Sequence, residues 1–201
     1  MCSTSDHVLI CRHDCELSSS TDVAKHPEFA DRKRNSSYSY DASYAEKEGW
    51  FTEDFTWAEI KTLRSIERIP NVRPQNSLWN ELFPILSLEQ FIQIHLAVVD
   101  SHSSGSRTPL TEATQGQGLF QGPGLYIETK HPSYFRSIGL PLENPLVELL
   151  NRAGYREMCA KGRPYCPIFL QSFEDNLSTL QDLAPYYPSI QVKCQLNSQF
   201  P

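Results

Sequence analysis

Apolar and polar positions give the second half of this chain a regular pattern. Short apolar runs predict strands at 124–130, 167–173 and 190–196. Between them, apolar residues recur every three or four positions, which predicts helices at 144–155 and 174–188. Strands that alternate with helices through short connections predict a parallel sheet with crossover helices.

The first half is less regular. One apolar run predicts a short buried strand at 7–12, and helical spacing predicts helices at 55–67 and 87–100. Thr56 and Glu59 stand three positions apart at the start of the first of these helices, the spacing of a capping box. His95 lies on the apolar face of the second helix, where a packing histidine is a better interpretation than a metal ligand.

Three further segments follow neither period, and we predict loops there. They are the polar, tyrosine-rich stretch 26–50, the proline-containing stretch 68–85 and the aromatic stretch 131–141. The predicted fold class is therefore α/β, and polar residues at the carboxyl ends of its parallel strands are the candidates for a site.

Composition and charge narrow the classes of function. The 201 residues, 39% hydrophobic and 21% charged, fit one soluble, globular domain. A formal net charge of -6 opposes non-specific binding to nucleic acid or to an anionic membrane, although it allows a local basic pocket for one phosphate. The negative net charge leads us to expect no nucleic-acid partner. No apolar run approaches the roughly 20 residues of a membrane helix, so we expect no transmembrane segment. The first residues lack a signal-peptide pattern, and the compartment stays open.

The six cysteines show no metal-binding spacing. None forms a CxxC pair, and none alternates with histidine as zinc ligands do. We expect scattered free thiols, several of them buried.

Arg12, His13 and Asp14 end the first apolar run and open a turn rich in serine and threonine. A histidine at the carboxyl end of a strand can act as a general acid or base near neutral pH. An ordinary loop histidine is the alternative. We take His13 as the candidate catalytic residue and Arg12 as a second-rank candidate for binding substrate.

Glu128 and Lys130 are two positions apart in the run "LYIETK", so both side chains point to one face of the predicted strand. Such a pair is costly on a buried strand unless its members serve each other or a ligand. They are either a structural ion pair, or a metal carboxylate beside an ammonium that holds a phosphate oxygen. Gln171, at a comparable strand end, is a second-rank substrate-binding candidate.

Taken together, these segments resemble one family. The stretches "SDHVLICRHDCELSSSTDV", "FTEDFTWAEIKTL", "LFPILSLEQFI", "LYIETKHPSYF" and "IFLQSFEDNL" are similar to the glycerophosphodiester phosphodiesterase family, above all to its periplasmic-type and plant-type members. The resemblance is collinear from about Ser5 to Leu196.

The resemblance implies a TIM (β/α)8 barrel that hydrolyses glycerophosphodiesters to glycerol 3-phosphate and an alcohol with one divalent cation, Ca²⁺ or Mg²⁺. His13 would be one half of the acid/base pair, Glu128 a metal ligand and Lys130 the phosphate clamp. Residues 1–201 would form a single partial barrel domain of about strands 2 to 5 or 6, with an inserted cap at about 24–80.

Two motifs that the family carries are absent. No His-Arg-Gly occurs in the chain, and no Glu-x-Asp precedes His13. We therefore interpret the chain as truncated at both ends and expect it to be inactive as a fragment, because a single carboxylate holds a hard dication poorly. One alternative is a short non-catalytic protein that binds a phosphate or a partner. Another is an unrelated α/β enzyme whose likeness to the family is accidental.

Overall fold

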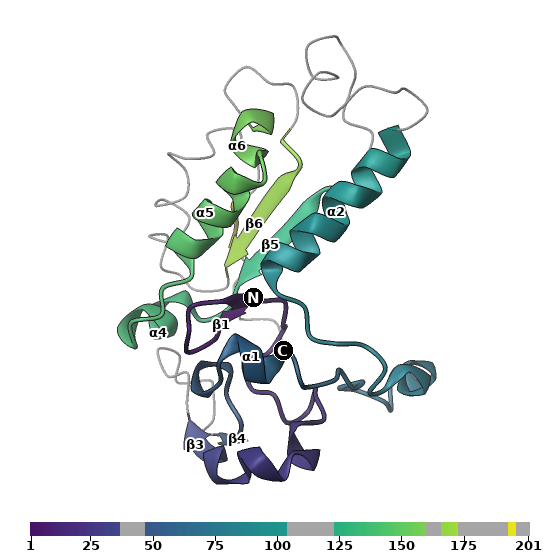
Figure 1. Cartoon of the computed structure of the whole chain (residues 1–201), viewed down its shortest axis with the longest axis vertical. Helices are drawn as coiled ribbons and strands as arrows, with labels where there is room; N and C mark the ends of the chain where they lie inside the picture. Colours follow the sequence, from purple (N-terminus) through teal and green to yellow (C-terminus); the bar gives the residue numbers. More distant parts are fainter. Residues whose placement is uncertain (37–46, 104–122, 160–165, 173–192, 196–201) are drawn as a thin grey trace. The chain divides into compact units, whose positions relative to one another are not determined.

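The computed structural model describes residues 1–36, 47–103, 123–159, 166–172 and 193–195 (Figure 1). The chain divides into two compact units. Unit 1 is Met1–Ser87 with Ser133–Leu142, and unit 2 is Leu88–Pro132 with Glu143–Pro201. Each unit is described by itself.

Unit 2 contains a three-stranded parallel sheet. Its strands are β5 (Leu125–Thr129), β6 (Ile168–Ser172) and β7 (Lys193–Gln195), in that order. The described residues of the same unit also form the helices α2 (Leu88–Ser103), α5 (Glu143–Arg152) and α6 (Tyr155–Met158). The parallel strands are confirmed, as are the helices expected at 87–100 and 144–155. The helix predicted at 174–188 lies outside the described residues.

Burial in unit 2 follows the strand and helix periods. Leu125, Ile127 and Thr129 point into the protein from β5, whereas Tyr126 between them is 57% exposed. Leu146 and Leu150, one helical turn apart on α5, are both fully buried. Gly154 adopts φ 80° just after the end of α5, a left-handed conformation that glycine takes without a steric cost.

His95 is a packing residue, as its place on the apolar face of α2 indicates. It is 7% exposed, Nδ1 lies 2.5 Å from the Tyr155 hydroxyl, and Nε2 lies 2.5 Å from the carbonyl oxygen of Pro123. Both ring nitrogens are thus used in holding unit 2 together.

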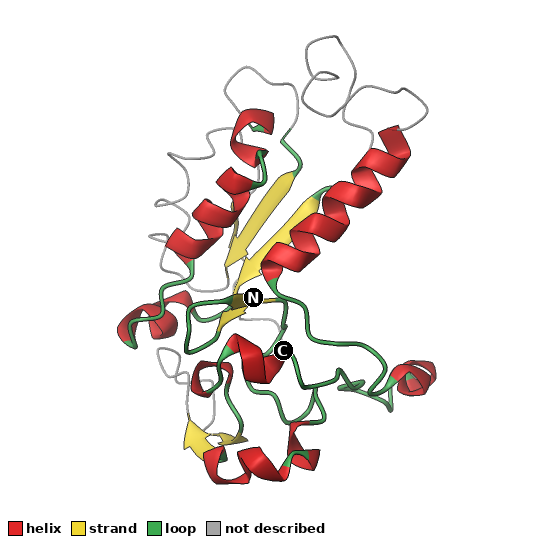
Figure 2. Cartoon of the chain, in the orientation of Figure 1, coloured by secondary structure: helices red, strands yellow, loops and turns green. Residues whose placement is uncertain are grey.

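Unit 1 consists of short elements (Figure 2). Two antiparallel pairs of strands are present: β1 (Cys2–Ser3) with β2 (Leu9–Ile10), and β3 (Arg34–Ser36) with β4 (Lys47–Gly49). The helical elements are α1 (Trp57–Ile60), α4 (Pro132–Ser137) and four 3-10 turns: η1 (Val23–Lys25), η2 (Pro27–Arg32), η3 (Thr52–Asp54) and η4 (Pro74–Trp79). Its core includes Leu9, Leu17, Phe51, Phe55, Ile60 and Phe135, all at most 1% exposed.

One predicted helix and one predicted strand of unit 1 are shorter in the structure than expected. The helix expected over 55–67 ends at Ile60, although the capping box of Thr56 and Glu59 is present as predicted. Beyond Ile60 the backbone forms long-range bonds instead: Asp22 and Arg64 exchange two hydrogen bonds. The strand expected over 7–12 is reduced to Leu9–Ile10, because the Cys11 amide already donates to Leu86.

The loop expected over 131–141 is also wrong, since its first half forms α4. Pro132 begins this helix, a position where its missing amide hydrogen costs nothing. Phe135 is fully buried and anchors the helix in the core of unit 1.

The fold class is mixed α/β. The described residues form three small sheets and no closed barrel, which agrees with an incomplete barrel without establishing one. No helix in the described part of the chain is long and apolar enough to cross a bilayer.

Candidate active-site residues in two units

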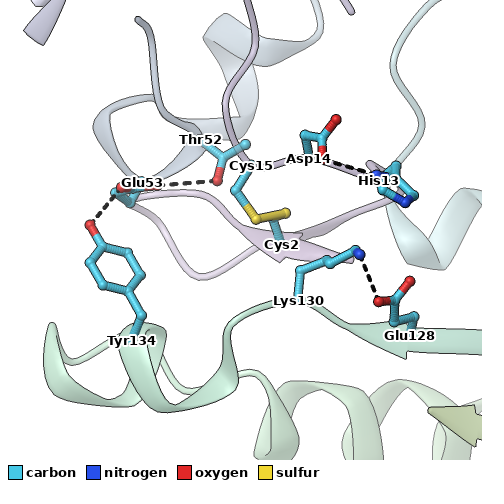
Figure 3. The surroundings of a disulfide bond; sticks show 9 residues. All are labelled: Cys2, His13, Asp14, Cys15, Thr52, Glu53, Glu128, Lys130 and Tyr134. Carbon is cyan, nitrogen blue, oxygen red and sulfur yellow. Dashed lines mark hydrogen bonds and ion pairs between the residues drawn. A yellow bond between two sulfur atoms is a disulfide. The ribbon is translucent and has the colours of Figure 1, made fainter. Parts of the chain in front are cut away.

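His13 is hydrogen-bonded to its neighbour in unit 1. Its Nδ1 lies 2.9 Å from Asp14 Oδ1 (Figure 3). The Asp14 carboxylate also accepts a hydrogen bond from Arg68 at 2.5 Å. Burial raises the pKa of the Asp14 carboxyl, but the hydrogen bonds and charges of His13 and Arg68 outweigh it, so this pKa lies below its ordinary value. An ionised Asp14 can only accept, so His13 carries a hydrogen on Nδ1 in this contact. The opposite nitrogen, Nε2, is then the atom that can exchange a proton, and the side chain is 63% exposed.

Arg12 is held in the interior of unit 1. Its two terminal nitrogens donate to Ser65 Oγ at 3.2 Å and to the carbonyl oxygen of Ser20 at 2.7 Å. Burial lowers the pKa of the guanidinium. Arg12 Nε and Ser20 Oγ are buried without a hydrogen-bond partner in the described part of the chain. Such atoms bind a water or a small polar ligand.

A disulfide closes the segment that carries His13. Cys2 and Cys15 are bonded, and their side chains are almost fully buried (Figure 3). A second disulfide joins Cys159 and Cys166 in unit 2. The expectation of scattered free thiols is therefore wrong for four of the six cysteines. An even number of cysteines is compatible with disulfide bonds. The spacing of the cysteines in the sequence does not reveal which of them are bonded to each other.

Cys11 is a free thiol between these partners in the sequence. Burial raises its pKa to about 11, against the opposing charges of the chain terminus and Arg12. The thiol is protonated and unreactive at neutral pH, which makes Cys11 a packing residue rather than a nucleophile.

Glu128 and Lys130 form an ion pair at the carboxyl end of β5. Lys130 Nζ lies 2.7 Å from Glu128 Oε1, and the two side chains are only 12% and 19% exposed, respectively. Strand alternation places both on one face, as the sequence predicts (Figure 3). The two residues therefore form the ion pair that was one of the two interpretations of the sequence. A role of either residue in binding a ligand is a proposal.

Gln171 is the neighbour of Glu128 in the sheet. The two are partners in the parallel register of β5 and β6, and Gln171 is 6% exposed. Two positions earlier, Tyr126 and Phe169 are also register partners, and their rings stack with centroids 6.2 Å apart. Because alternate residues share a face, Glu128 and Gln171 lie on the face that carries these rings.

The structure thus forms two groups from the predicted residues. Arg12 and His13 belong to unit 1, whereas Glu128, Lys130 and Gln171 belong to unit 2. Arg68, Ser20 and Ser65 complete the surroundings of the first group and were not predicted. No local signal identifies them, because Arg68 is 54 residues from Asp14 in sequence.

A buried carboxyl in unit 1 also escaped the sequence analysis. Glu53 has a side chain only 4% exposed and accepts hydrogen bonds from the Tyr134 hydroxyl at 2.7 Å and from Arg34 at 3.0 Å. Burial raises the pKa of Glu53, and the bond from Tyr134 opposes this rise. Tyr134 is thus bonded to Glu53, and its neighbour Phe135 is fully buried, so both residues of this aromatic segment pack within unit 1.

The described residues do not fit a metal site by themselves. No group of three or more histidine, cysteine, aspartate or glutamate side chains suited to a cation occurs among them. Glu128 supplies one carboxylate, whose Oε1 is engaged by Lys130. A Ca²⁺ or Mg²⁺ ion requires several oxygen ligands, so Glu128 could contribute only one of a larger set.

The sequence is similar to a known protein family and to one curated plant protein. Residues 2–115 match the model of the Glycerophosphoryl diester phosphodiesterase family, and the chain belongs to this family of phosphoric diester hydrolases. The chain is also 34% identical over 177 residues to Glycerophosphodiester phosphodiesterase GDPD6 of Arabidopsis thaliana. That alignment covers 85% of this chain and 40% of the relative, so the chain spans less than half of the relative's length.

Proposed function

We propose that the protein hydrolyses glycerophosphodiesters to glycerol 3-phosphate and an alcohol, and that residues 1–201 carry only part of the machinery. The observation that carries the proposal is the cluster of Glu128, Lys130 and Gln171 on one face at the carboxyl ends of parallel strands. Sites of parallel α/β proteins occupy this edge of the sheet. The family membership supports the same reaction class.

In this proposal Lys130 holds a phosphate oxygen. Its side chain is only 12% exposed, and Glu128 keeps its ammonium oriented at 2.7 Å. A phosphodiester anion could replace part of that interaction through a charge-assisted hydrogen bond. Gln171 would add an amide donor from the neighbouring strand.

His13 serves in the proposal as one half of an acid/base pair. Asp14 holds Nδ1, which directs Nε2 toward the reacting oxygen atoms. One histidine cannot donate and accept in the same step, and no second histidine is assigned to the pair. The divalent cation, Ca²⁺ or Mg²⁺, would neutralise phosphate charge in the complete site, with Glu128 as one ligand.

As a consequence, we propose that the chain by itself has no turnover. The lack of a three-carboxylate group among the described residues favours this outcome. The same observation favours a second candidate function, a short protein that binds a phosphate or a partner without catalysis. The partial fold would then be an incomplete TIM barrel of about strands 2 to 5 or 6 with the cap at about 24–80.

One experiment separates these functions. The purified chain is incubated with glycerophosphocholine and Ca²⁺ or Mg²⁺, and the release of glycerol 3-phosphate is measured beside His13→Ala. In parallel, calorimetry measures the binding of glycerol 3-phosphate to the chain and to Lys130→Ala. Turnover that His13→Ala abolishes would contradict inactivity of the fragment. If the chain binds glycerol 3-phosphate without turnover, and Lys130→Ala removes this binding, the non-catalytic function is supported. If neither turnover nor binding is observed, Glu128 and Lys130 are a structural ion pair.

A further inference from the structure

Two disulfide bonds indicate the kind of compartment in which the chain folds. Cys2 is bonded to Cys15 and Cys159 to Cys166, and three of these four cysteines are at most 1% exposed. Disulfides form and persist in oxidising compartments such as the secretory pathway, and they are rare in the cytosol, where thiols are kept reduced. A chain that matures in the secretory pathway also meets the enzymes that attach glycans to asparagine.

The sequence contains two acceptor motifs for such a glycan. The motif is Asn-x-Ser/Thr, in which x is not proline. Two of the eight asparagines fit it: Asn35, in the run "NSS", and Asn176, in the run "NLS". Of the two, Asn35 belongs to the part of the chain that the structure describes. A motif of three residues also arises by chance, so the position of Asn35 in the structure decides whether a glycan fits there.

Asn35 is the middle residue of β3 and points away from the core of unit 1. Its neighbour Arg34 points inward: the guanidinium donates to Asp54 at 2.6 Å and to Glu53 at 3.0 Å, and it lies over the ring of Phe51. Because alternate residues of a strand point to opposite faces, Asn35 faces the other way, and it is exposed whereas Arg34 is partly buried. A glycan on Asn35 would therefore extend into solvent.

The surroundings of Asn35 leave its amide available. Its partner in the antiparallel pair of β3 and β4 is Glu48, whose carboxylate accepts a hydrogen bond from Lys33 at 2.9 Å (Figure 1). The Asn35 side chain makes no hydrogen bond within the part of the chain that the structure describes. Attachment of a glycan to this side chain therefore breaks no interaction among the described residues.

The motif and the exposure together single out Asn35. Asn71 and Asn76 are exposed as well, but neither is followed two positions later by serine or threonine. Asn35 thus combines the acceptor motif, an exposed side chain and a chain whose disulfides require an oxidising compartment.

We propose that Asn35 carries an N-linked glycan, which is attached in the secretory pathway. The donor is a lipid-linked oligosaccharide. Nδ2 of Asn35 attacks the anomeric carbon of the first sugar, the bond from this carbon to the pyrophosphate oxygen breaks, and a carbon–nitrogen bond forms. The amide nitrogen loses one proton, and the lipid pyrophosphate leaves. No electrons enter or leave the chain, so the step needs no oxidant or reductant.

Peptide mapping of the protein from its natural source tests the proposal without any variant. Trypsin cleaves after Arg34 and Lys47 and releases residues 35–47, in which Asn35 is the only asparagine. Treatment with peptide N-glycosidase in heavy-oxygen water should convert this asparagine to aspartate that carries the heavy oxygen. A digest without the glycosidase is the control, because spontaneous deamidation also yields aspartate.

Variants expressed in a eukaryotic host assign the glycan to the motif. The chain is secreted behind a cleavable secretion signal, with Asn176→Gln in every version so that a single motif remains. Mobility on a denaturing gel is compared before and after treatment with peptide N-glycosidase. We expect the treatment to shift the parent and Ser36→Ala, which keeps the Asn-x-Ser motif, but to leave Ser37→Ala and Asn35→Gln unchanged.

Two results would overturn the proposal. One is an unmodified Asn35 in the protein from its natural source, even if the secreted chain is glycosylated. The other is a mobility shift that persists in Ser37→Ala or in Asn35→Gln. Both readouts follow the attachment of sugar to the chain and require no variant to be folded or active, so they are independent of the reaction proposed for His13 and Lys130.

Discussion

Glu59 shows how much one residue can connect in unit 1. Its carboxylate accepts two hydrogen bonds from Arg32, at 2.6 and 2.9 Å, and one from the amide of Thr56 at 2.9 Å. The bonds from Arg32 lower the pKa of Glu59 to about 2, with Thr56 adding to the effect and partial burial opposing it. The sequence revealed the Thr56 bond through the capping-box spacing, but it gave no sign of Arg32.

This shift predicts a pH dependence of stability. The ordinary pKa of a glutamate is 4.5 and that of Glu59 in the folded chain is about 2, so its contribution is fully present above about pH 4.5 and is lost as the pH falls toward 2. As the pH is lowered between these values, the melting temperature should fall less steeply in Glu59→Gln than in the unmodified chain. Glu148→Gln, at an exposed position in unit 2, is the control and should follow the unmodified chain. If the melting temperature of all three proteins fell in parallel as the pH is lowered, the low pKa assigned to Glu59 would be contradicted.

A second residue-scale prediction concerns the buried carboxyl of Glu53. Tyr134→Phe removes the donor that lies 2.7 Å from Glu53 Oε1 and leaves that oxygen with less compensation for its burial. We expect a loss of about 1–3 kcal/mol in the free energy of unfolding at neutral pH, measured by urea denaturation. The loss should be smaller at acidic pH. Burial raises the pKa of Glu53, and the protonated carboxyl carries no charge whose burial the bond from Tyr134 must compensate.

Tyr126→Phe is the matched control for that experiment. It removes the same hydroxyl from a tyrosine that is 57% exposed and keeps the ring that stacks on Phe169. A smaller loss is expected for it, because a hydroxyl on a largely exposed side chain is less desolvated than one packed on a buried carboxyl. A loss equal to that of Tyr134→Phe would show that the hydroxyl bond to Glu53 has no special weight.

At the scale of elements, local pattern and long-range pairing compete. The strands β5 and β6 of unit 2 follow the apolar runs because alternate residues of β5 and most residues of β6 are buried, and helix α2 follows its apolar period. In unit 1 the predicted helix 55–67 is cut at Ile60, because Arg64 bonds to Asp22 from a distant part of the chain. Helical propensity is a weak preference that such pairings override.

The disulfide of Cys2 and Cys15 holds the short strands β1 and β2 beside the His13 segment. The cysteines are 13 residues apart, a loop length for which cross-linking stabilises the folded state by about 3 kcal/mol. The double variant Cys2→Ser/Cys15→Ser should therefore unfold at a clearly lower urea concentration. Cys11→Ser, at the free thiol, is the control and should have a much smaller effect.

Thiol counting checks both disulfides directly. Unfolding without a reductant should expose at most two reactive thiols, since four of the six cysteines are paired, and prior reduction should expose all six. Disulfides persist mainly in oxidising compartments, so we expect the chain to fold best under oxidising conditions. More than two reactive thiols before reduction would contradict the pairing.

At the scale of the whole molecule, the candidate residues are divided between the two units. Glu128 and Lys130 are paired on β5, and His13 is paired with Asp14 in unit 1. Because the described residues form no cation-binding group of three ligands, millimolar Ca²⁺ or Mg²⁺ should leave the melting temperature of the chain unchanged. A rise in melting temperature that Glu128→Gln abolishes would instead show that the chain binds the ion by itself.

Sequence alone located the polar residues at the ends of the strands. The runs that form β5 and β6 are visible because a buried strand needs consecutive apolar residues, and Glu128, Lys130 and Gln171 follow from strand alternation. His13 was recognisable as a polar residue at the end of an apolar run. The family likewise followed from motifs in the sequence, and the match over residues 2–115 shows it.

Only the tertiary structure decided which distant residues meet. It joined Cys2 to Cys15, Arg68 to Asp14 and Tyr134 to Glu53, the last pair 81 residues apart. It also left six large apolar side chains exposed, those of Ile69, Val72, Leu78, Trp79, Leu82 and Phe83. The physical reason is the same in each case: periodicity reports which face of an element is apolar, whereas a specific pairing depends on the path of the whole chain.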